Sequence, residues 1–144
     1  MEWLDIVDEN GVPTGQVVSR QKAHRLGLRH RTSHVWIVRR REGNLQVLLQ
    51  KRSEEKDSYP GCYDISSAGH IPAGADFVPS ALRELKEETG AVPDVFLPLG
   101  RILPAPGCYG ETLHLFLARG LRMEEQHLDP DEFLNVERIP FDEM

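Results

Sequence analysis

Three glutamates crowd into one short helical segment, and this feature constrains the chain more than any other. Residues 69–91 read GHIPAGADFVPSALRELKEETGA, which places Glu84, Glu87 and Glu88 at positions i, i+3 and i+4. Side chains at these spacings lie on one face of an α-helix, where like charges repel and weaken the helix. The segment therefore requires either a cation beside this face or a solvated surface that screens it.

The segment from Asp76 to Thr89 is otherwise a good helix. Asp76 is suited to the N-cap, Pro79 falls in the first turn, and Gly90 offers the left-handed residue that commonly ends a helix. Five side chains share the arc that is expected to face a sheet: Val78, Ala81, Leu82, Leu85 and Thr89.

A single arginine is too little to balance this acidic face. Arg83 lies four residues before Glu87 and can pair with it, but one guanidinium does not balance three carboxylates. Mg²⁺ suits the site because it prefers hard oxygen ligands and commonly leaves positions for waters and substrate phosphates, and Mn²⁺ is the alternative. The acidic spacing alone leaves a metal site and a solvated acidic face as equal alternatives.

Length and charge narrow the class of protein. The 144 residues suit one domain, residues 1–144, and the 40% hydrophobic content is sufficient for one core. A net charge of −6 argues against general binding to nucleic-acid polymers or to anionic membranes. The basic strip of residues 20–31 can still contact the phosphates of a small ligand, or can be solvated surface.

Targeting and redox signals are weak in this sequence. The acidic N-terminus lacks a signal-peptide pattern, and the apolar runs are far shorter than the ~20 residues of a membrane helix. Cys62 and Cys108 do not have the spacing of a disulfide framework or a zinc site. These observations predict a cytoplasmic protein with reduced thiols.

The pattern of short strands and helices predicts an α+β fold, an α/β/α sandwich with a mixed β-sheet between helices. Helices are expected at 19–27 and 76–89, and turn chemistry at 8–15. Strands are expected at 3–7, 33–40, 45–52, 62–68, 95–103, 112–119 and 133–139. Residues 140–144 read as the opening of a further helix, so the domain is expected to lack a complete C-terminal helix.

Residues 69–91 resemble the Nudix box. The family pattern is Gly, five residues, Glu, seven residues, then Arg-Glu-aliphatic-x-Glu-Glu-x-Gly-aliphatic, and the strands around this stretch resemble the Nudix order. The resemblance implies Mg²⁺-dependent hydrolysis of a diphosphate linkage in a nucleoside diphosphate derivative or a related small molecule, and it admits a homodimer. The sequence departs from the pattern at Ala75, where the family has glutamate; the adjacent Asp76 is expected to cap the helix rather than replace that carboxylate.

The resemblance also implies roles for individual residues. Carried over by position, it makes Glu84, Glu87 and Glu88 metal ligands, with Glu87, Glu88 and Arg83 forming the catalytic set. Separately from the resemblance, Lys51 and Arg52 stand at the end of the strand expected at 45–52 and are expected to contact substrate phosphates, and His70 is expected to bind substrate as well. The general base stays open between the glutamates of the box and three others, Glu111, Glu132 and Glu137.

A second resemblance is to the isopentenyl-diphosphate isomerase branch of the same superfamily. It is carried by residues 4–11, Ala23-His24, His30, Tyr59-Pro60-Gly61 and Gly69-His70. In that branch three histidines and two glutamates hold a metal, and the histidines here occupy similar places. That branch also needs a cysteine just before the Gly-His pair, where this sequence has Ala68.

Three interpretations follow. A hydrolase related to the isomerases is preferred, an isomerase is the alternative, and Ala75 is the argument for a non-catalytic diphosphate-binding module. The three histidines are expected in ordinary roles rather than in a second metal site: His24 and His30 on the basic strip, and His70 hydrogen-bonded in a loop.

Overall fold

The main sheet of the protein is mixed. The computed structural model describes residues 1–55, 59–103, 111–127 and 134–143. The strand order is β5-β4-β3-β8-β7, with β6 paired to β3 and β9 paired to β4. The strands are β3 (His30–Arg41), β4 (Asn44–Arg52), β5 (Tyr63–Asp64), β6 (Ser67–His70), β7 (Ala91–Ile102), β8 (Glu111–Met123) and β9 (Leu134–Pro140). Strands β3 and β8 run parallel, whereas β4 and β6 each pair antiparallel with β3.

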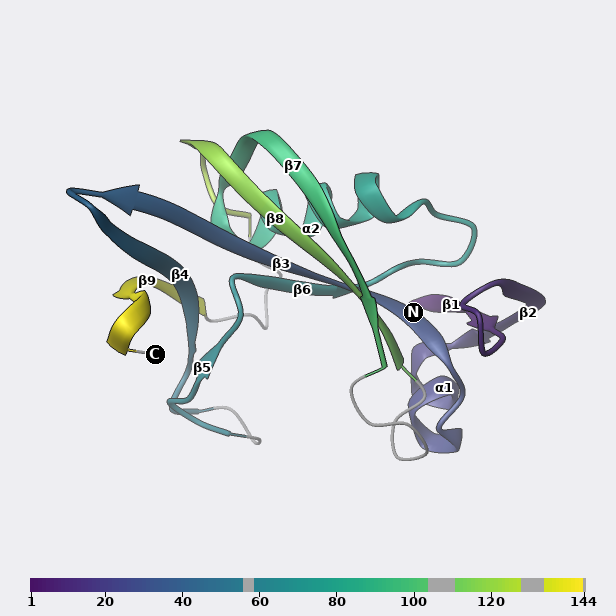
Figure 1. Cartoon of the computed structure of the whole chain (residues 1–144). Coiled ribbons are helices and arrows are strands. Elements are labelled where there is room, and N and C mark those ends of the chain that lie inside the picture. The colour runs from purple at the N-terminus through teal and green to yellow at the C-terminus, as the bar shows by residue number, and fades with distance from the viewer. Residues whose placement is uncertain (56–58, 104–110, 128–133, 144) are drawn as a thin grey trace.

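A smaller unit stands at one end of this sheet (Figure 1). Strands β1 (Trp3–Val7) and β2 (Pro13–Ser19) pair antiparallel, and helix α1 (Arg20–Leu26) packs against both. The Ser19 hydroxyl accepts a hydrogen bond from the Lys22 amide, and Gly27 ends the helix at φ 61°. Four buried side chains form its core: Leu4, Ile6, Val18 and Ala23.

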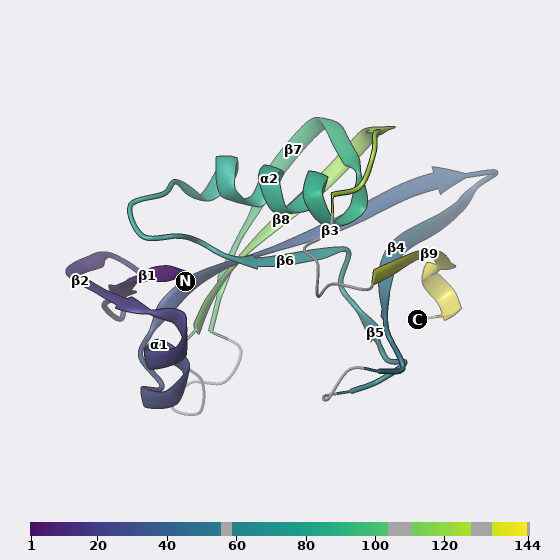
Figure 2. The ribbon, with the colours of Figure 1, turned by 180° about the vertical axis from the view of Figure 1, so that it is seen from behind.

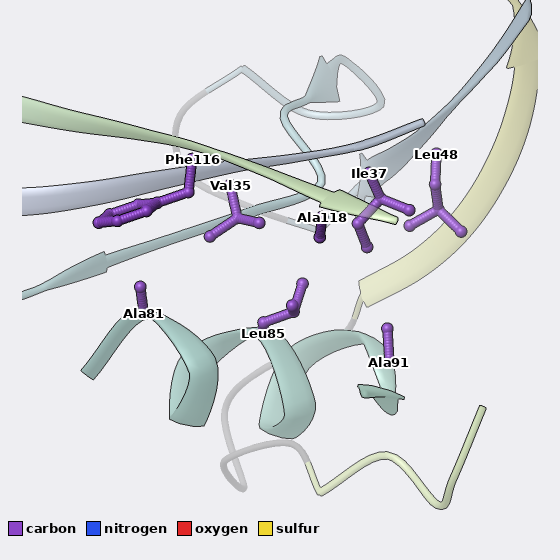
Figure 3. Packing of buried hydrophobic residues seen from close by; sticks show 8 residues of the cluster. All are labelled: Val35, Ile37, Leu48, Ala81, Leu85, Ala91, Phe116 and Ala118. Atoms are coloured by element: carbon purple, nitrogen blue, oxygen red, sulfur yellow. The ribbon is translucent and has the colours of Figure 1, made fainter. Parts of the chain in front are cut away.

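Helix α2 (Phe77–Thr89) lies against one face of the main sheet (Figures 1 and 2). Ala81 and Leu85 point from the helix toward the strands, as Figure 3 shows. They pack with a cluster of buried residues: Val35, Ile37, Leu48, Ala91, Phe116 and Ala118. This packing fixes the rotation of α2 about its axis and therefore fixes which way its polar residues face.

A buried ion pair joins the smaller unit to the rest of the fold. The Arg31 guanidinium donates to the Asp5 carboxylate over 2.8 Å, with the two side chains 8% and 12% exposed. The same carboxylate oxygen accepts from the Gly74 amide, and Arg31 also donates to the Ala75 carbonyl. Arg31 was counted in the basic strip as a phosphate contact or a solvated charge, and the structure corrects this because its partner is Asp5.

The structure confirms most of the expected elements. Strand β1, helices α1 and α2, and the β3–β4 hairpin lie where they were predicted. The strand β2 already begins at Pro13, inside the segment expected to be a turn, and β7 begins at Ala91, four residues early. Residues 141–143 form a 3₁₀-helix.

Two predictions about local structure were wrong. The expected strand at 62–68 is two strands, because β5 pairs with β4 and β6 pairs with β3. Between them the Ser66 hydroxyl accepts from the Ile37 amide and donates to the Leu48 carbonyl, which replaces ladder hydrogen bonds at the crossing. Val78 was expected to face the sheet but is 44% exposed, and the neighbouring Phe77 packs against the core instead.

Replacing Leu85 with alanine tests whether the α2 contact holds the fold together. Leu85 is fully buried, so Leu85→Ala should lower the free energy of unfolding by about 2–5 kcal/mol. The matched change Val78→Ala removes a half-exposed side chain from the same helix and should cost less than about 0.5 kcal/mol. Urea denaturation measures both, and equal losses would contradict the assigned face of α2.

Candidate functional site

The three glutamates of α2 meet in one polar cavity of about 570 Å³. Strand β6 contributes Ala68, Gly69 and His70 to its lining, and β3 contributes Thr32 and His34. The remaining lining residues come from both ends of the chain and from the helix: Glu2, Arg20, Pro72, Arg83, Glu84, Glu87, Glu88 and His127. The cavity therefore lies between α2, the sheet and the smaller N-terminal unit.

Glu88 is the most enclosed of the three acidic side chains, at 8% exposure. The Gln50 side-chain amide donates to its Oε2 over 3.0 Å, and the Ala68 backbone amide donates to the same oxygen over 3.3 Å. A buried carboxylate requires such donors, because an uncompensated charge in the interior is costly. Glu88 is thereby held against the sheet.

Arg83 pairs with the other two glutamates and offsets part of their charge. Its guanidinium donates to Glu84 over 2.5 Å and to Glu87 over 2.8 Å. The expected i, i+4 pairing of Arg83 with Glu87 is thus present. Glu84 also approaches the β6 backbone so closely that a Cβ on Gly69 would lie 2.5 Å from its Cγ, so a side chain at position 69 would displace Glu84.

These carboxylates suit a divalent cation. They supply hard oxygen ligands to one cavity, which is the donor chemistry that Mg²⁺ and Mn²⁺ favour. A cation already stands between two of them, namely the guanidinium of Arg83. The carboxylates thus supply the ligand type that the sequence predicted for a metal, and their role as metal ligands stays a prediction.

A cluster of three histidines that could hold a metal ion reaches the same cavity through His70. His24, His30 and His70 each offer one ring nitrogen, and these nitrogens lie within 4.8 Å of one another. His24 Nε2 and His70 Nε2 are 3.0 Å apart. His30 is only 5% exposed and its Nδ1–H donates to the Leu28 carbonyl, which turns Nε2 toward the other two rings. The expectation that His24 and His30 belong to a surface strip was wrong for His30, because the fold buries it among the rings.

The environment of His70 disfavours its charged form. Burial lowers the pKa of His70 from 6.5 to about 3, and the positive charges of Arg20, His30 and His24 act in the same direction. The ring is therefore neutral in ordinary buffers and keeps a nitrogen lone pair available for a hydrogen bond or a cation.

Two further histidines lie on β3 and β8. His34 lines the cavity, whereas His114 stacks on the Phe77 ring with 3.7 Å between the ring centroids. Burial lowers the pKa of His114 to about 4, with Arg101 and Arg31 acting in the same direction.

The substrate-binding residues predicted from the sequence separate into two groups. His70 lines the cavity, but Lys51 and Arg52 are not among the described residues of its lining. Lys51 lies over the Tyr63 ring, 5.9 Å from its centroid, and Arg52 pairs with Asp64 over 3.5 Å. Both side chains thus have partners on β5, the strand that pairs with the end of β4.

Among the described residues, no candidate general base from outside residues 69–91 lines the cavity. Glu137 accepts a hydrogen bond from the Tyr63 hydroxyl over 2.6 Å on the β4–β9 side of the sheet. Glu132 and the side chain of Glu111 lie outside the described part of the chain. Asp76 occupies the N-cap position of α2 as expected, but its side chain makes no capping hydrogen bond.

Sequence reasoning missed several residues that the fold brings to the site. Gln50 contacts Glu88, while Glu2 and His127 line the cavity. The alternation of strand β4 indicates that Gln50 shares a face with Leu48, which would have suggested a buried amide. Glu2 and His127 come from segments far from residues 69–91 in the sequence, and no local pattern connects them to it. Arg20, which the basic strip of residues 20–31 offered as a phosphate contact, also lines the cavity.

Comparisons with known proteins agree on one family. The family model described as NUDIX domain matches residues 28–144. Nudix hydrolase 3 of Arabidopsis thaliana is 36% identical over 99% of this chain and 20% of its own length. An uncharacterised Nudix hydrolase of Clostridium acetobutylicum is 34% identical over 99% of this chain and 72% of its own length. The chain thus spans only one fifth of the plant relative.

Solved structures agree on the fold. A crystal structure of a Deinococcus radiodurans protein matches with a TM-score of 0.70 and 22% identity, over 96% of this chain and 83% of that one. This likeness shows the Nudix fold, a mixed sheet with two helices. Among the described residues, no helix has the length and apolar character required to cross a membrane.

The depressed pKa of His70 predicts a pH-dependent stability. The unfolded chain takes up a proton near the usual pKa of 6.5, whereas the folded chain does so only near 3. The contribution of the neutral ring is therefore complete above pH 6.5 and is lost as the pH falls toward 3. His70→Asn should lose less stability than the wild type between pH 7.5 and 4.5 in urea denaturation. The exposed His127→Asn is the control, and equal losses in the wild type and His70→Asn would refute the prediction.

Proposed function

Because this chain belongs to the Nudix hydrolase family, which acts on diphosphate bonds, we propose that it is a Mg²⁺-dependent pyrophosphohydrolase of a nucleoside diphosphate derivative or a related compound. The observation that carries the proposal is the convergence of Glu84, Glu87 and Glu88 on one cavity that also holds cationic side chains. A module that only binds diphosphates does not need three carboxylates in its cavity. Carboxylates repel the negatively charged diphosphate unless a metal ion bridges the carboxylates and the phosphates.

The proposed metal ligands are Glu84, Glu87 and Glu88. A divalent cation held there would neutralise phosphate oxygens and lower the pKa of a bound water. Arg83 on α2 and Arg20 on α1 both line the cavity, and their positive charges can bind phosphate oxygens. Glu87 is 41% exposed, which makes it the most accessible of the three carboxylates and our choice of general base.

Two solved structures bear on the substrate class. An ADP compounds hydrolase has 25% identity and a TM-score of 0.55, over 97% of this chain and 69% of that one. A NUDIX domain of Shewanella oneidensis NrtR in complex with ADP ribose has 18% identity and a TM-score of 0.56, over 78% and 73%. Nucleoside diphosphate derivatives are therefore the first compounds to test.

The histidine cluster favours a second candidate, an isomerase acting on isopentenyl diphosphate. His24, His30 and His70 gather as the resemblance to that branch requires. The position before the Gly-His pair is Ala68, however, and an alanine has no group that exchanges a proton with carbon. Hydrolysis, which uses water and needs no thiol at this position, is therefore the preferred reaction.

A substrate panel separates the candidates. The purified protein is incubated with Mg²⁺ and ADP-ribose, other nucleoside diphosphate derivatives, or isopentenyl diphosphate. Hydrolysis predicts monophosphate or phosphate release that EDTA abolishes and Mg²⁺ restores. Formation of dimethylallyl diphosphate supports the isomerase, and binding without product supports the binding module.

Glu88→Gln tests the role of the acidic cluster. The substitution removes one negative charge from the proposed metal site and should reduce kcat by at least about 10²-fold, with the circular dichroism spectrum unchanged. Glu125→Gln is the matched control, because Glu125 is exposed and is not among the described residues of the cavity lining. Full activity in Glu88→Gln would exclude the assigned role.

A further inference from the structure

We infer that Gln50 is a positioning residue that orients Glu88 for the metal, an inference that rests on the function proposed above. Gln50 lies on β4 and is 6% exposed. Its side-chain amide donates to Glu88 Oε2 and to the Ser66 carbonyl, each over 3.0 Å. Gln50 is not among the described residues of the cavity lining, so its connection to the proposed metal site runs through Glu88.

The orientation of the Gln50 amide is fixed by its partners. The Ser66 carbonyl can only accept a hydrogen bond, and the Glu88 oxygen accepts one as well. Rotating the amide by half a turn would place its oxygen against both acceptors, so the NH₂ group must face them. Gln50 thus serves as a dedicated double donor.

Ser66 anchors this arrangement in the sheet. It is fully buried, and its hydroxyl accepts from the Ile37 amide on β3 and donates to the Leu48 carbonyl on β4. Two central strands therefore hold the carbonyl that aligns Gln50. A continuous hydrogen-bonded path leads from the sheet to a carboxylate on α2.

The Ala68 amide completes the restraint on Glu88. It donates to the same oxygen, Oε2, over 3.3 Å. With two donors on one oxygen, the carboxylate plane has a fixed direction before any metal arrives. Partners that orient metal ligands commonly account for 10–100-fold in metal affinity or activity.

Gln50→Met tests the inference, since methionine has a similar length and no donor. Titration of the whole protein with Mn²⁺, followed by electron paramagnetic resonance, measures affinity without turnover. We expect the dissociation constant for Mn²⁺ to rise by roughly 10–100-fold in Gln50→Met. The Mg²⁺ concentration that gives half-maximal hydrolysis should rise by a similar factor. Gln46→Met on the same strand is the control, because Gln46 accepts from Arg39 and is not among the described residues of the cavity lining.

A double-mutant cycle separates positioning from packing. If Gln50 acts through Glu88, Gln50→Met should have no further effect on Mn²⁺ affinity in a Glu88→Gln background. Additive losses would overturn the inference, as would an unchanged Mn²⁺ affinity accompanied only by a lower Tm.

Should Gln50→Met fail to fold, Gln50→Asn replaces it, because the shorter amide cannot span both acceptors. A wild-type protein that binds no Mn²⁺ overturns the proposed function as well, whereas Mn²⁺ binding that Gln50→Met leaves unchanged overturns the inference alone.

Discussion

Repulsion among Glu84, Glu87 and Glu88 is the constraint to which the surrounding structure responds. At ~4–6 Å separation, like charges on a helix cost a few tenths of a kcal/mol in water and more where the solvent is excluded. The fold uses two means to offset this. Arg83 pairs with Glu84 and Glu87 near the surface, and polar hydrogens of Gln50 and Ala68 stabilise the buried Glu88. The acidic cluster is therefore compatible with a folded helix before a metal binds.

The ion pair between Asp5 and Arg31 links the parts of the fold that surround the cavity. It anchors β1 to β3 and, through the Gly74 amide and the Ala75 carbonyl, to the loop that leads into α2. The N-terminal unit that carries Glu2 and Arg20 is thereby placed beside the acidic face of α2. Removing one partner of such a buried pair commonly costs 3–5 kcal/mol, so this wall of the cavity is a firm part of the fold.

Local sequence signals predicted the helices and strands but not the contacts between them. The helix expected at 19–27 and the spacing of Ala81 and Leu85 rest on short-range features, and the structure agrees with both. The Ser66 crossing between β5 and β6 depends on backbone groups of two other strands, which no local pattern contains.

The site follows the same division. Residues 69–91 identified the three glutamates and Arg83, because their chemistry lies within one helix. Lys51 and Arg52 were expected at the site because they end a strand, but their partners are Tyr63 and Asp64 on β5. The histidine cluster joins α1, β3 and β6, so only the folded chain brings its rings together.

The unequal burial of the three glutamates divides the site into a fixed part and an adjustable part. Arg83 is 49% exposed, and ion pairs at such positions contribute at most about 1 kcal/mol, so a divalent cation can displace it from Glu84 and Glu87 at little cost. The hydrogen bonds to Glu88 are buried, and charge-assisted bonds of this kind are worth about 1.5–3 kcal/mol each. In the proposed reaction, the restrained Glu88 would therefore hold the cation at a fixed position, while Glu84 and Glu87 would adjust around it and Arg83 would become available to contact phosphate oxygens.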